Sequence, residues 1–213
     1  FVDNASTDDS IEFIKRKFSQ NKRLRIIQNE RNFGFAEGNN IGMRNAKGEY
    51  ITLLNNDTKV DTNWLKELVK AFQSPEIGAA QSKLLQVDNP DLFDCAGGFL
   101  DYYGYPSERG HGEEDKGQYN LSEEIFYAKA AACMFRRKVL KEVGLFDPEL
   151  FMYYEDTDLS WRIRLRGYKI VFVPTSIVYH ASGKTIAKVK KPIQRYFVSR
   201  NRMSTLIKNY NIR

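Results

Sequence analysis

Acidic and amide side chains gather in this chain directly after an apolar run at residues 50–54, where Asn55, Asn56 and Asp57 follow one another. An open α/β sheet places its ligands beside polar residues at the carboxyl ends of its strands. An acid in that position can hold a hard divalent cation together with substrate phosphates, because such ions need few protein oxygens. An Asx turn is the other common use of such residues, and the sequence alone leaves both interpretations open.

A second acidic group, containing Glu155, Asp156 and Asp158, opens a segment with the apolar spacing of a helix. Acids in a first helical turn complement the helix dipole, so they need no function to explain them. One of them beside a cleft would instead act as a general base that takes a proton from a hydroxyl group.

Two further polar segments contain residues suited to nucleotide contacts. Residues 3–8 (DNASTD) carry short side chains that can bond a base or a ribose, although the same string is a good turn and helix cap. Residues 32–40 (NFGFAEGNN) combine glycines, which allow close backbone approach, with a helix N-terminus that favours an anion. The GxxxxGK[ST] string of a P-loop is absent from the sequence.

The histidines and cysteines exclude several other kinds of site. Neither His111 nor His180 has the spacing of a zinc motif, and a lone His180 after an apolar strand is more often structural than a ligand. We expect His111, in a glycine-rich segment, to be exposed. Cys95 and Cys133 form no CxxC motif, and Cys133 lies in an apolar run typical of a core. So few cysteines suit a reducing compartment, which makes the cytoplasm the default location.

Strand and helix patterns alternate over the first ninety residues and predict an α/β architecture with a mainly parallel sheet flanked by helices. Residues 86–125 are rich in glycine and acids and predict a mobile loop rather than core. Strand and helix patterns return after that segment. No linker divides the first 183 residues, so we expect one domain over residues 1–183 and a separate helical segment over residues 184–213.

The charge of the chain is concentrated at its end. Of its 213 residues 33 are basic and 27 acidic, yet residues 184–213 hold nine basic residues and no acid. The first 183 residues therefore carry a net charge of −3, which argues against nucleic acid as a partner. Apolar residues recur at helical spacing within the basic tail, which predicts an amphipathic helix. Contact with an anionic membrane and packing on the domain explain this pattern equally well. No apolar run in the sequence approaches the ~20 residues that span a bilayer.

Five ordered motifs give the chain a strong resemblance to a known family. They are VDNASTDDS (2–10), NFGFAEGNNIG (32–42), LLNND (53–57), GLFDPELFMYYEDTDLSWRIRLRGY (144–168) and PTSIVYH (174–180). In this order they resemble the family 2 glycosyltransferases with the GT-A fold, in particular the rhamnosyltransferase-like branch. The resemblance spans residues 2–180, and five ordered blocks are far more specific than any one of them.

The resemblance implies a role for each matching position. Asp57 is the metal-binding acid of the family's DxD motif and His180 a second metal ligand, while Asp156 is the catalytic base with Glu155 beside it and Asp158 in support. Asn55 stands where the family's DxD motif has its first acid, which predicts weaker metal affinity. The implied donor-binding residues are Asp3, Asn4, Gly34, Asn39, Asn40, Asn55 and Asn56.

The chemistry that the resemblance implies is metal-dependent and inverting. The base accepts a proton from an acceptor hydroxyl, which attacks the anomeric carbon of a nucleotide-sugar, while Mg²⁺ or Mn²⁺ neutralises charge on the departing diphosphate. The implied partners are a dTDP- or UDP-linked donor and a glycan or lipid-linked acceptor at the cytoplasmic membrane face, in cell-surface polysaccharide synthesis. Tyr102, Tyr103 and Tyr105 fall where such enzymes vary in acceptor recognition, and exposed tyrosines without a role are the alternative.

One departure from the family's pattern bears on activity. Relatives open with a further strand and helix before the VDN strand, and this sequence starts within that strand, at Phe1. We therefore expect an incomplete sheet and weaker donor binding than in a longer chain. Two other interpretations stay open: a sugar-phosphate nucleotidyltransferase, which shares a nucleotide-binding sheet, and a non-catalytic domain that binds a nucleotide-sugar or a glycan.

Overall fold

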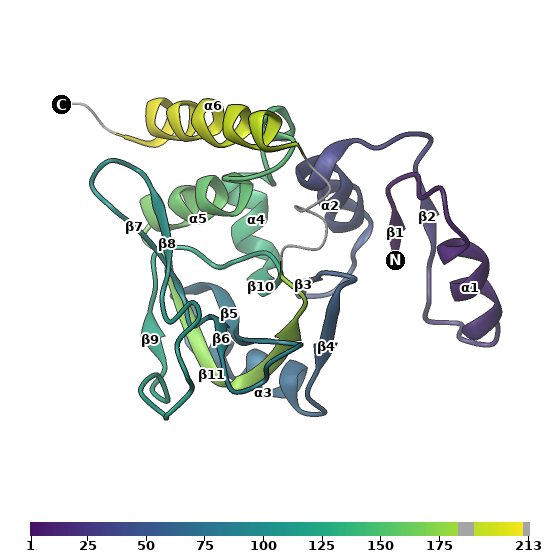
Figure 1. Ribbon diagram of the computed structural model, residues 1–213, viewed down its shortest axis with the longest axis horizontal. Coiled ribbons are helices and arrows are strands. Elements are labelled where there is room, and N and C mark those ends of the chain that lie inside the picture. The colour runs from purple at the N-terminus through teal and green to yellow at the C-terminus, as the bar shows by residue number, and fades with distance from the viewer. Residues whose placement is uncertain (183–189, 211–213) are drawn as a thin grey trace.

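The computed structural model describes residues 1–182 and 190–210 (Figure 1). Its centre is a seven-stranded sheet formed by β3 (Tyr50–Leu54), β4 (Thr58–Val60), β5 (Ile77–Gln86), β6 (Phe93–Cys95), β9 (Glu123–Glu124), β10 (Ala132–Arg136) and β11 (Lys169–His180). Five of these strands follow the order β3–β10–β5–β11–β4, while β6 pairs with β5 and β9 pairs with β11. The predicted α/β class is confirmed.

The sheet is mixed, which corrects the prediction of a mainly parallel one. Only β5 and β11 pair in parallel within it, and every other described pair in this sheet is antiparallel. The reversal comes from β10, which enters between β3 and β5 and runs against both. A parallel neighbour would need a crossover, usually helical, whereas the chain reaches β10 through residues 86–131, which contain short strands and no helix.

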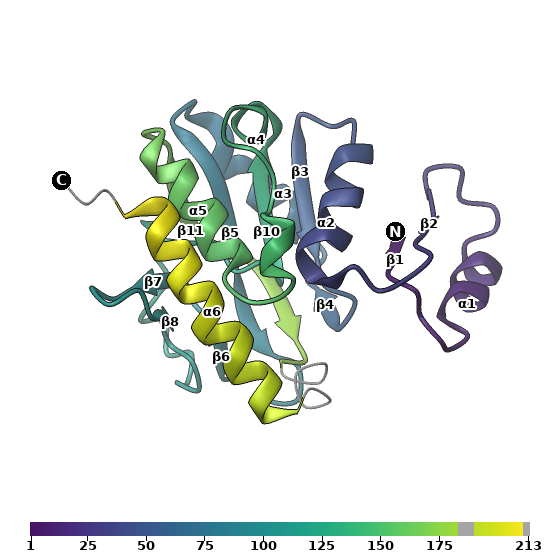
Figure 2. The same cartoon turned by 90° about the horizontal axis from the view of Figure 1, so that it is seen from above.

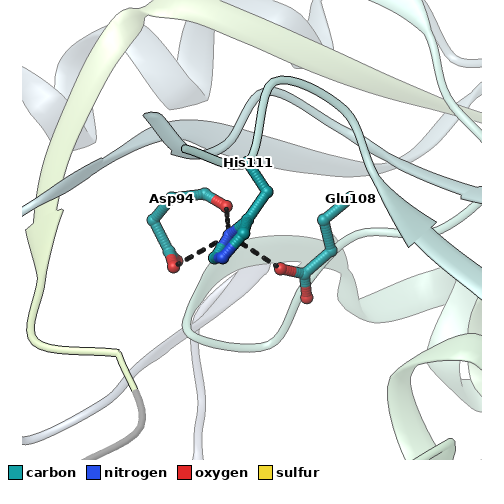
Figure 3. Close-up of side chains that lie close together, drawn as sticks. All are labelled: Asp94, Glu108 and His111. Carbon is teal, nitrogen blue, oxygen red and sulfur yellow. Dashed lines mark hydrogen bonds and ion pairs between the residues drawn. The ribbon is translucent and has the colours of Figure 1, made fainter. Parts of the chain in front are cut away.

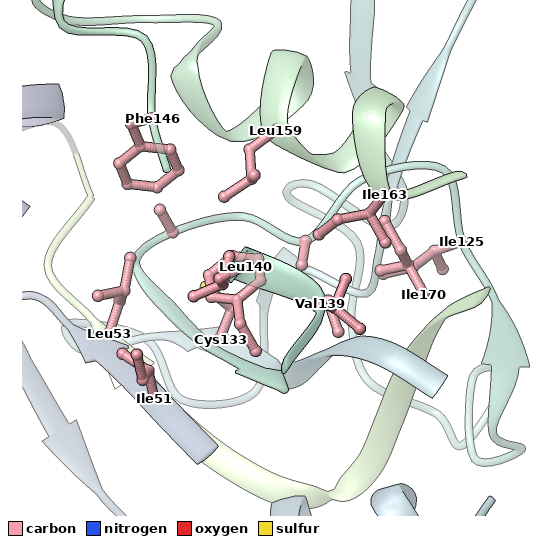
Figure 4. Close-up of a cluster of buried hydrophobic side chains, with 14 of the residues drawn as sticks. Ile51, Leu53, Ile125, Cys133, Val139, Leu140, Phe146, Leu159, Ile163 and Ile170 are labelled. Carbon is pink, nitrogen blue, oxygen red and sulfur yellow. The ribbon is translucent and has the colours of Figure 1, made fainter. Parts of the chain in front are cut away.

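Helices cover both faces of this sheet (Figures 1 and 2). Alternation along β10 separates the two layers, because Cys133 and Phe135 join one buried cluster and Met134 joins another. The larger cluster lies beneath α2 (Gly34–Asn45), α4 (Arg137–Val143) and α5 (Glu155–Leu165), and Figure 4 shows part of it. The smaller cluster lies beneath α3 (Trp64–Lys70) and the 3₁₀ turn η1 (Ala71–Gln73). The core position predicted for Cys133 is confirmed.

The first thirty residues form a unit of their own at one side of the molecule (Figures 1 and 2). Its strands β1 (Val2–Asp3) and β2 (Ile27–Gln28) pair in parallel around α1 (Ser10–Lys17). Among the described residues this small sheet is not hydrogen-bonded to the central one. The expectation of weaker donor binding than in a longer chain stays a prediction.

Residues 86–125 are ordered and partly buried, so the prediction of a mobile loop outside the core is wrong. Phe93 and Cys95 of β6 are fully buried, and β7 (Gly98–Leu100) forms a hairpin with β8 (Pro106–Glu108). Arg109 fixes the segment, because its Nε and Nη2 donate to the Ala96 carbonyl oxygen at 3.0 and 2.7 Å. Composition misled here because the glycines serve tight turns, as at Gly97 with φ 121°.

The C-terminal helix α6 (Lys191–Asn209) packs across α5, so this part of the basic tail belongs to the body of the protein (Figure 2), while residues 184–189 and 211–213 of the predicted segment lie outside the described residues. The stripe that it buries is polar, formed by Asn201, Thr205 and Asn209. Most of the apolar stripe that the sequence predicts lies on the opposite, exposed side, with Ile193, Tyr196, Met203 and Ile207 between 46% and 76% exposed, whereas the Tyr210 ring meets Trp161 of α5 edge to face.

Asn201 connects α6 to the turn that leads into α5. Its Nδ2 lies 2.8 Å from the carbonyl oxygens of Leu150, Met152 and Tyr153, and its side chain is fully buried. Leu150 ends the 3₁₀ turn η2 (Pro148–Leu150). The two hydrogens of this buried amide are therefore shared among three backbone carbonyl oxygens, of which that of Leu150 also accepts from the Met152 amide and from Arg200.

We predict that Asn201→Ala lowers the free energy of unfolding by about 1–3 kcal/mol, because it removes the side-chain donor of the Met152 and Tyr153 carbonyl oxygens. Urea denaturation of the two proteins measures the difference. Ser199→Ala, two residues away on the exposed side of the same helix, is the matched control and should change stability by less than about 0.5 kcal/mol. Equal effects of the two substitutions would contradict the role given to Asn201.

Candidate active site

A pocket of about 650 Å³ opens at the carboxyl ends of β3 and β11. Segments far apart in the chain line it: the loop after β1, the start of α2, the loop after β3, the approach to β10, the start of α5 and α6. Seven residues singled out in the sequence lie in its wall, namely Asn4, Gly34, Asn55, Asn56, Asp57, Asp156 and His180. The fold thus gathers side chains that are up to 176 positions apart in the sequence.

One end of the pocket holds Asp57 and His180 side by side. The Nε2 atom of His180 lies 3.4 Å from Oδ1 of Asp57, and the Ala181 amide donates to the Asp57 carbonyl oxygen at 2.9 Å. Oδ1 of Asp57 is buried without a hydrogen-bond partner. An orphaned carboxylate oxygen beside an imidazole nitrogen fits a divalent cation, since two ligand atoms of one such ion lie about 3 Å apart.

A buried charge network supports His180 from behind. Its Nδ1 lies 2.9 Å from Oδ2 of Asp94, a fully buried residue of β6, and Lys129 Nζ lies 3.0 Å from the same oxygen. Lys129 also contacts Glu108 at 2.9 Å. Burial opposes the ionisation of Asp94, but the His180 hydrogen bond and the Lys129 charge outweigh it and lower the pKa of Asp94. Glu108 and Asp94 in turn raise the pKa of Lys129 against the effect of its burial.

No motif in the sequence singles out these three residues, Asp94, Glu108 and Lys129. All three sit in or beside the segment that we took for a loop, so their charges suggested solvent. The position of Asp94 between the apolar residues Phe93 and Cys95 could have identified it. An acid flanked by two core residues is costly to bury without a partner, so this position implies that a partner is present.

Asp94, Glu108 and His111 form a cluster whose ligand atoms all lie within 4.8 Å of one another (Figure 3). His111 Nδ1 is bonded to the backbone oxygen of Asp94 at 2.9 Å, and its side chain is 58% exposed, which confirms the predicted exposure. Lys129 bridges the two acids and already supplies a positive charge. We therefore assign the cluster to the support of the pocket and not to a second cation.

Asp156 enters the pocket wall from the start of α5. Its Oδ2 accepts a hydrogen bond from the Ala130 amide at 3.3 Å and its Oδ1 from the Thr157 amide at 2.7 Å. The turn before it contains three non-glycine residues at positive φ, Phe151, Tyr153 and Tyr154, at 61°, 69° and 71°. Such conformations cost energy and persist only where the surroundings enforce them.

Glu155 and Asp156 are neighbours with different surroundings. Glu155 is buried outside the pocket wall, and its Oε2 has no hydrogen-bond partner. Burial, and next the charge of Asp156, raises the pKa of Glu155 well above its usual value. Burial also raises the pKa of Asp156, against the two amides that hold it. Asp158 is structural in this arrangement, because Arg162 at 2.8 Å and Asn209 at 2.8 Å occupy its carboxylate.

The predicted donor-binding residues divide into two groups. Asn4 lines the pocket, and its amide also joins the loop after β1 to residues 29–34 through four hydrogen bonds. Position 34 requires glycine for two reasons: its φ is 83°, and a Cβ there would lie 2.4 Å from the Phe151 ring. Asp3, Asn39 and Asn40 do not line the pocket.

The three side chains outside the pocket bond within the protein instead. The Asp3 carboxylate accepts from the Ser6 amide at 3.2 Å, and Asn39 Nδ2 donates to the Phe35 carbonyl oxygen at 2.9 Å. Asn40 is buried, with Nδ2 donating to the Phe146 carbonyl oxygen at 2.9 Å and Oδ1 accepting from the Phe146 amide at 3.0 Å. This geometry gives Asn40 a packing role in place of the predicted donor contact.

The exposed tyrosines lie on the hairpin next to the pocket. Tyr102 and Tyr103 are 82% and 68% exposed and meet edge to face at 5.7 Å. Tyr105 lies beneath the guanidinium of Arg202 in α6, 4.3 Å from the ring centroid. Pro106 and Glu108 of the same hairpin line the pocket, so the aromatic tip stands at its edge.

We predict that Glu155→Gln removes a pH dependence of stability. A raised pKa in the folded state stabilises the protein below the usual value near 4.5, and this stabilisation is lost as pH rises through the raised value. As pH rises above 4.5, the wild type should therefore lose free energy of unfolding that the variant retains. Urea titrations at several pH values measure this; parallel curves for the two proteins would show that Glu155 is not held in its neutral form.

Comparisons with known proteins place the chain in a family. The model of Glycosyl transferase family 2 matches residues 1–144. The chain is 30% identical over 159 residues to the O-antigen biosynthesis protein RfbC of Myxococcus xanthus, covering 71% of this chain and 12% of that protein. It is 26% identical over 198 residues to the poly-beta-1,6-N-acetyl-D-glucosamine synthase of Staphylococcus epidermidis, covering 92% of this chain and 45% of that protein. The chain thus spans less than half the length of these relatives.

The solved structures agree on the fold. The crystal structure of GalNAc-T7 with UDP, GalNAc and Mn²⁺ matches with a TM-score of 0.68 at 20% identity, over 84% of this chain and 36% of that chain. This similarity shows the GT-A fold and confirms the fold that the motifs implied. The family model covers more than half of the chain, and the chain therefore belongs to glycosyl transferase family 2.

Proposed function

We propose that this chain is the catalytic domain of an inverting glycosyltransferase. It moves a sugar from a nucleotide-diphosphate-sugar to a hydroxyl group of a glycan or lipid-linked acceptor, in cell-surface polysaccharide synthesis. The observation that carries the proposal is one pocket whose wall contains both an orphaned carboxylate beside an imidazole and a separate acid with a raised pKa. The relatives named for O-antigen and poly-N-acetylglucosamine synthesis support the same class of product.

Asp57 and His180 would hold Mg²⁺ or Mn²⁺ in this enzyme. The ion, when bound, neutralises negative charge on a departing diphosphate. The orphaned Oδ1 of Asp57 and the Nε2 of His180 are the two ligand atoms that we assign among the described residues, and further positions would be filled by phosphate oxygens and water. Mn²⁺ together with UDP in the structure of GalNAc-T7 supports this assignment.

Asp156 would act as the general base. A carboxylate with a raised pKa is a stronger base than an ordinary aspartate, so it takes a hydroxyl proton more readily near neutral pH. The Ala130 and Thr157 amides hold its two oxygens in place. The activated hydroxyl attacks the anomeric carbon from the face opposite the nucleotide, which inverts the configuration at that carbon.

The donor would lie along Asn4, Gly34, Asn55 and Asn56, with UDP or dTDP as the nucleotide. Asn55 and Asn56 offer amide side chains and Gly34 open backbone, which suits a base and a ribose, while Asn4 shapes the wall with an amide that already bonds four groups of the protein. The exposed tyrosines at the pocket edge would stack on an acceptor sugar. A non-catalytic domain that binds a nucleotide-sugar or a glycan would use the same pocket wall but would not need Asp156 as a base. A sugar-phosphate nucleotidyltransferase would not need a base at Asp156 either.

We predict that two variants of this pocket separate binding from catalysis. Wild-type protein binds UDP or dTDP more tightly with Mn²⁺ than without it, Asp57→Asn loses that metal dependence, and Asp156→Asn keeps it. Transfer or hydrolysis of a UDP-sugar falls about 100-fold or more in Asp156→Asn, because general-base catalysis is worth about that much. Calorimetric titration and release of free nucleotide measure the two effects. Undiminished turnover in Asp156→Asn would refute the transferase mechanism.

We also propose that the exposed side of α6 contacts an anionic membrane, which would place the enzyme at the inner face of the cell membrane. Lys191 and Arg195 are exposed on the same helix as the apolar stripe, and residues 191–209 contain no acid, although Lys208 is paired with Asp147. Apolar side chains between basic ones are the composition of helices that lie in a membrane interface. No helix in the described parts of the chain has the length and apolar character needed to cross a bilayer.

We predict that the protein sediments with vesicles containing phosphatidylglycerol and does so less at high salt, because screening weakens the attraction. Tyr196→Ser combined with Ile207→Ser should weaken binding by roughly tenfold or more, since two exposed apolar side chains are lost. Leu121→Ser, which removes an equally exposed apolar side chain outside α6, is the control and should bind like the wild type. Failure of the wild type to sediment would refute membrane contact through α6.

A further inference from the structure

We infer that Asp94 is a positioning residue of the pocket: it holds the Nδ1 proton of His180 and thereby turns the free Nε2 of that ring toward Asp57. The inference deepens the proposed function, since it rests on His180 as a metal ligand. Asp94 itself does not line the pocket, so it acts only through the imidazole.

The strand arrangement brings the two side chains together. His180 ends β11, which pairs in parallel with β5, and its backbone lies opposite Gln86. Asp94 lies in β6, which pairs with the other side of β5 next to Leu84 and Leu85. The two side chains meet across the end of β5 with 2.9 Å between Nδ1 and Oδ2, where Asp94 is fully buried and the side chain of His180 is 7% exposed. In this one orientation of the His180 ring, Nδ1 contacts Asp94 while Nε2 faces Asp57.

Lys129 fixes which partner gives the proton. An ammonium group only donates, and Lys129 Nζ lies 3.0 Å from the same Oδ2 atom that contacts His180. Oδ2 is therefore an acceptor, and the hydrogen between it and the ring belongs to Nδ1. Glu108 holds Lys129 from the other side at 2.9 Å, which keeps the ammonium in place.

The opposite side of the ring then presents a nitrogen to the pocket. Nε2 lies 3.4 Å from Oδ1 of Asp57, an oxygen that has no hydrogen-bond partner. A histidine that ligates a metal commonly donates its second N–H to a carboxylate, which fixes the orientation of the ring, and loss of that partner costs 10- to 100-fold in metal affinity. The chain of contacts from Lys129 through Asp94 to His180 has this form.

The test compares two substitutions at Asp94 by Mn²⁺ binding, measured by electron paramagnetic resonance in the presence of UDP. Asp94→Leu removes the acceptor and should weaken Mn²⁺ binding by roughly 10- to 100-fold. Asp94→Asn keeps an acceptor oxygen at the Oδ2 position and should stay within a few-fold of the wild type. Asp115→Asn, which removes a carboxylate paired with Lys83 at 2.7 Å, controls for the general loss of such a pair and should bind like the wild type.

A second readout needs no metal. The chain has two histidines, so His111→Gln leaves His180 as the source of imidazole signals in a proton NMR spectrum. A buried N–H held by a carboxylate exchanges slowly with water, and we expect its downfield signal in the His111→Gln protein. The signal should persist when Asp94→Asn is added and disappear when Asp94→Leu is added. Thermal unfolding identifies folded variants, and Asp94→Ala replaces Asp94→Leu if the latter does not fold.

The outcomes separate the two proposals. Absence of the downfield signal in the His111→Gln protein, or unchanged Mn²⁺ affinity in Asp94→Leu, overturns the positioning role while leaving the proposed function standing. If the His111→Gln protein shows the downfield signal but the wild type binds no Mn²⁺, the metal site of the proposed function is refuted. The role of Asp94 in orienting a metal ligand is refuted with it. Equal losses in Asp94→Asn and Asp94→Leu would show that Asp94 contributes charge and not ring orientation.

Discussion

The arrangement of the pocket depends on the strained turn at residues 151–154. Three of its non-glycine residues have positive φ, and the turn places Asp156 in the pocket wall. Contacts from both ends of the chain hold this conformation: Gly34 makes room for the Phe151 ring, the Phe151 carbonyl oxygen accepts from the Ala36 amide, and Asn201 binds the backbone of the turn. Strain of this kind persists only where surrounding contacts enforce it, so α2 and α6 determine the position of the proposed base.

The acids of the site differ in charge because their surroundings differ. Asp94 is fully buried yet ionised, since Lys129 and His180 both bond it. Glu155 is also buried but has no donor for Oε2, and burial favours its neutral form. Asp156 lies between these cases, with two backbone amides that stabilise its charge and burial that opposes it. Burial alone therefore does not set the protonation state of a carboxyl group; the donors within reach decide it.

Sequence patterns located the elements whose periodicity reflects their burial. The apolar run at 50–54 forms a strand and the acids at 155–158 open α5 as expected, because apolar periodicity is a local signal. Residues 86–125 were misjudged, since β6 is too short for a periodicity and its burial comes from pairing with β5. Asn40 looked like a donor contact because motifs do not show which side of a helix faces the core.

Helix α6 buries its polar side, so the amphipathic pattern of its sequence did not identify the side that packs on the protein. An amphipathic pattern predicts that the apolar stripe faces the core, yet here the buried stripe is Asn201, Thr205 and Asn209. The reason lies in what it covers: backbone carbonyl oxygens of the turn and the Asp158 carboxylate need donors, and an apolar stripe would leave them unsatisfied. The apolar residues are consequently left outside, next to basic ones. The same helix that holds the turn of the proposed base thus also forms the surface proposed to contact a membrane.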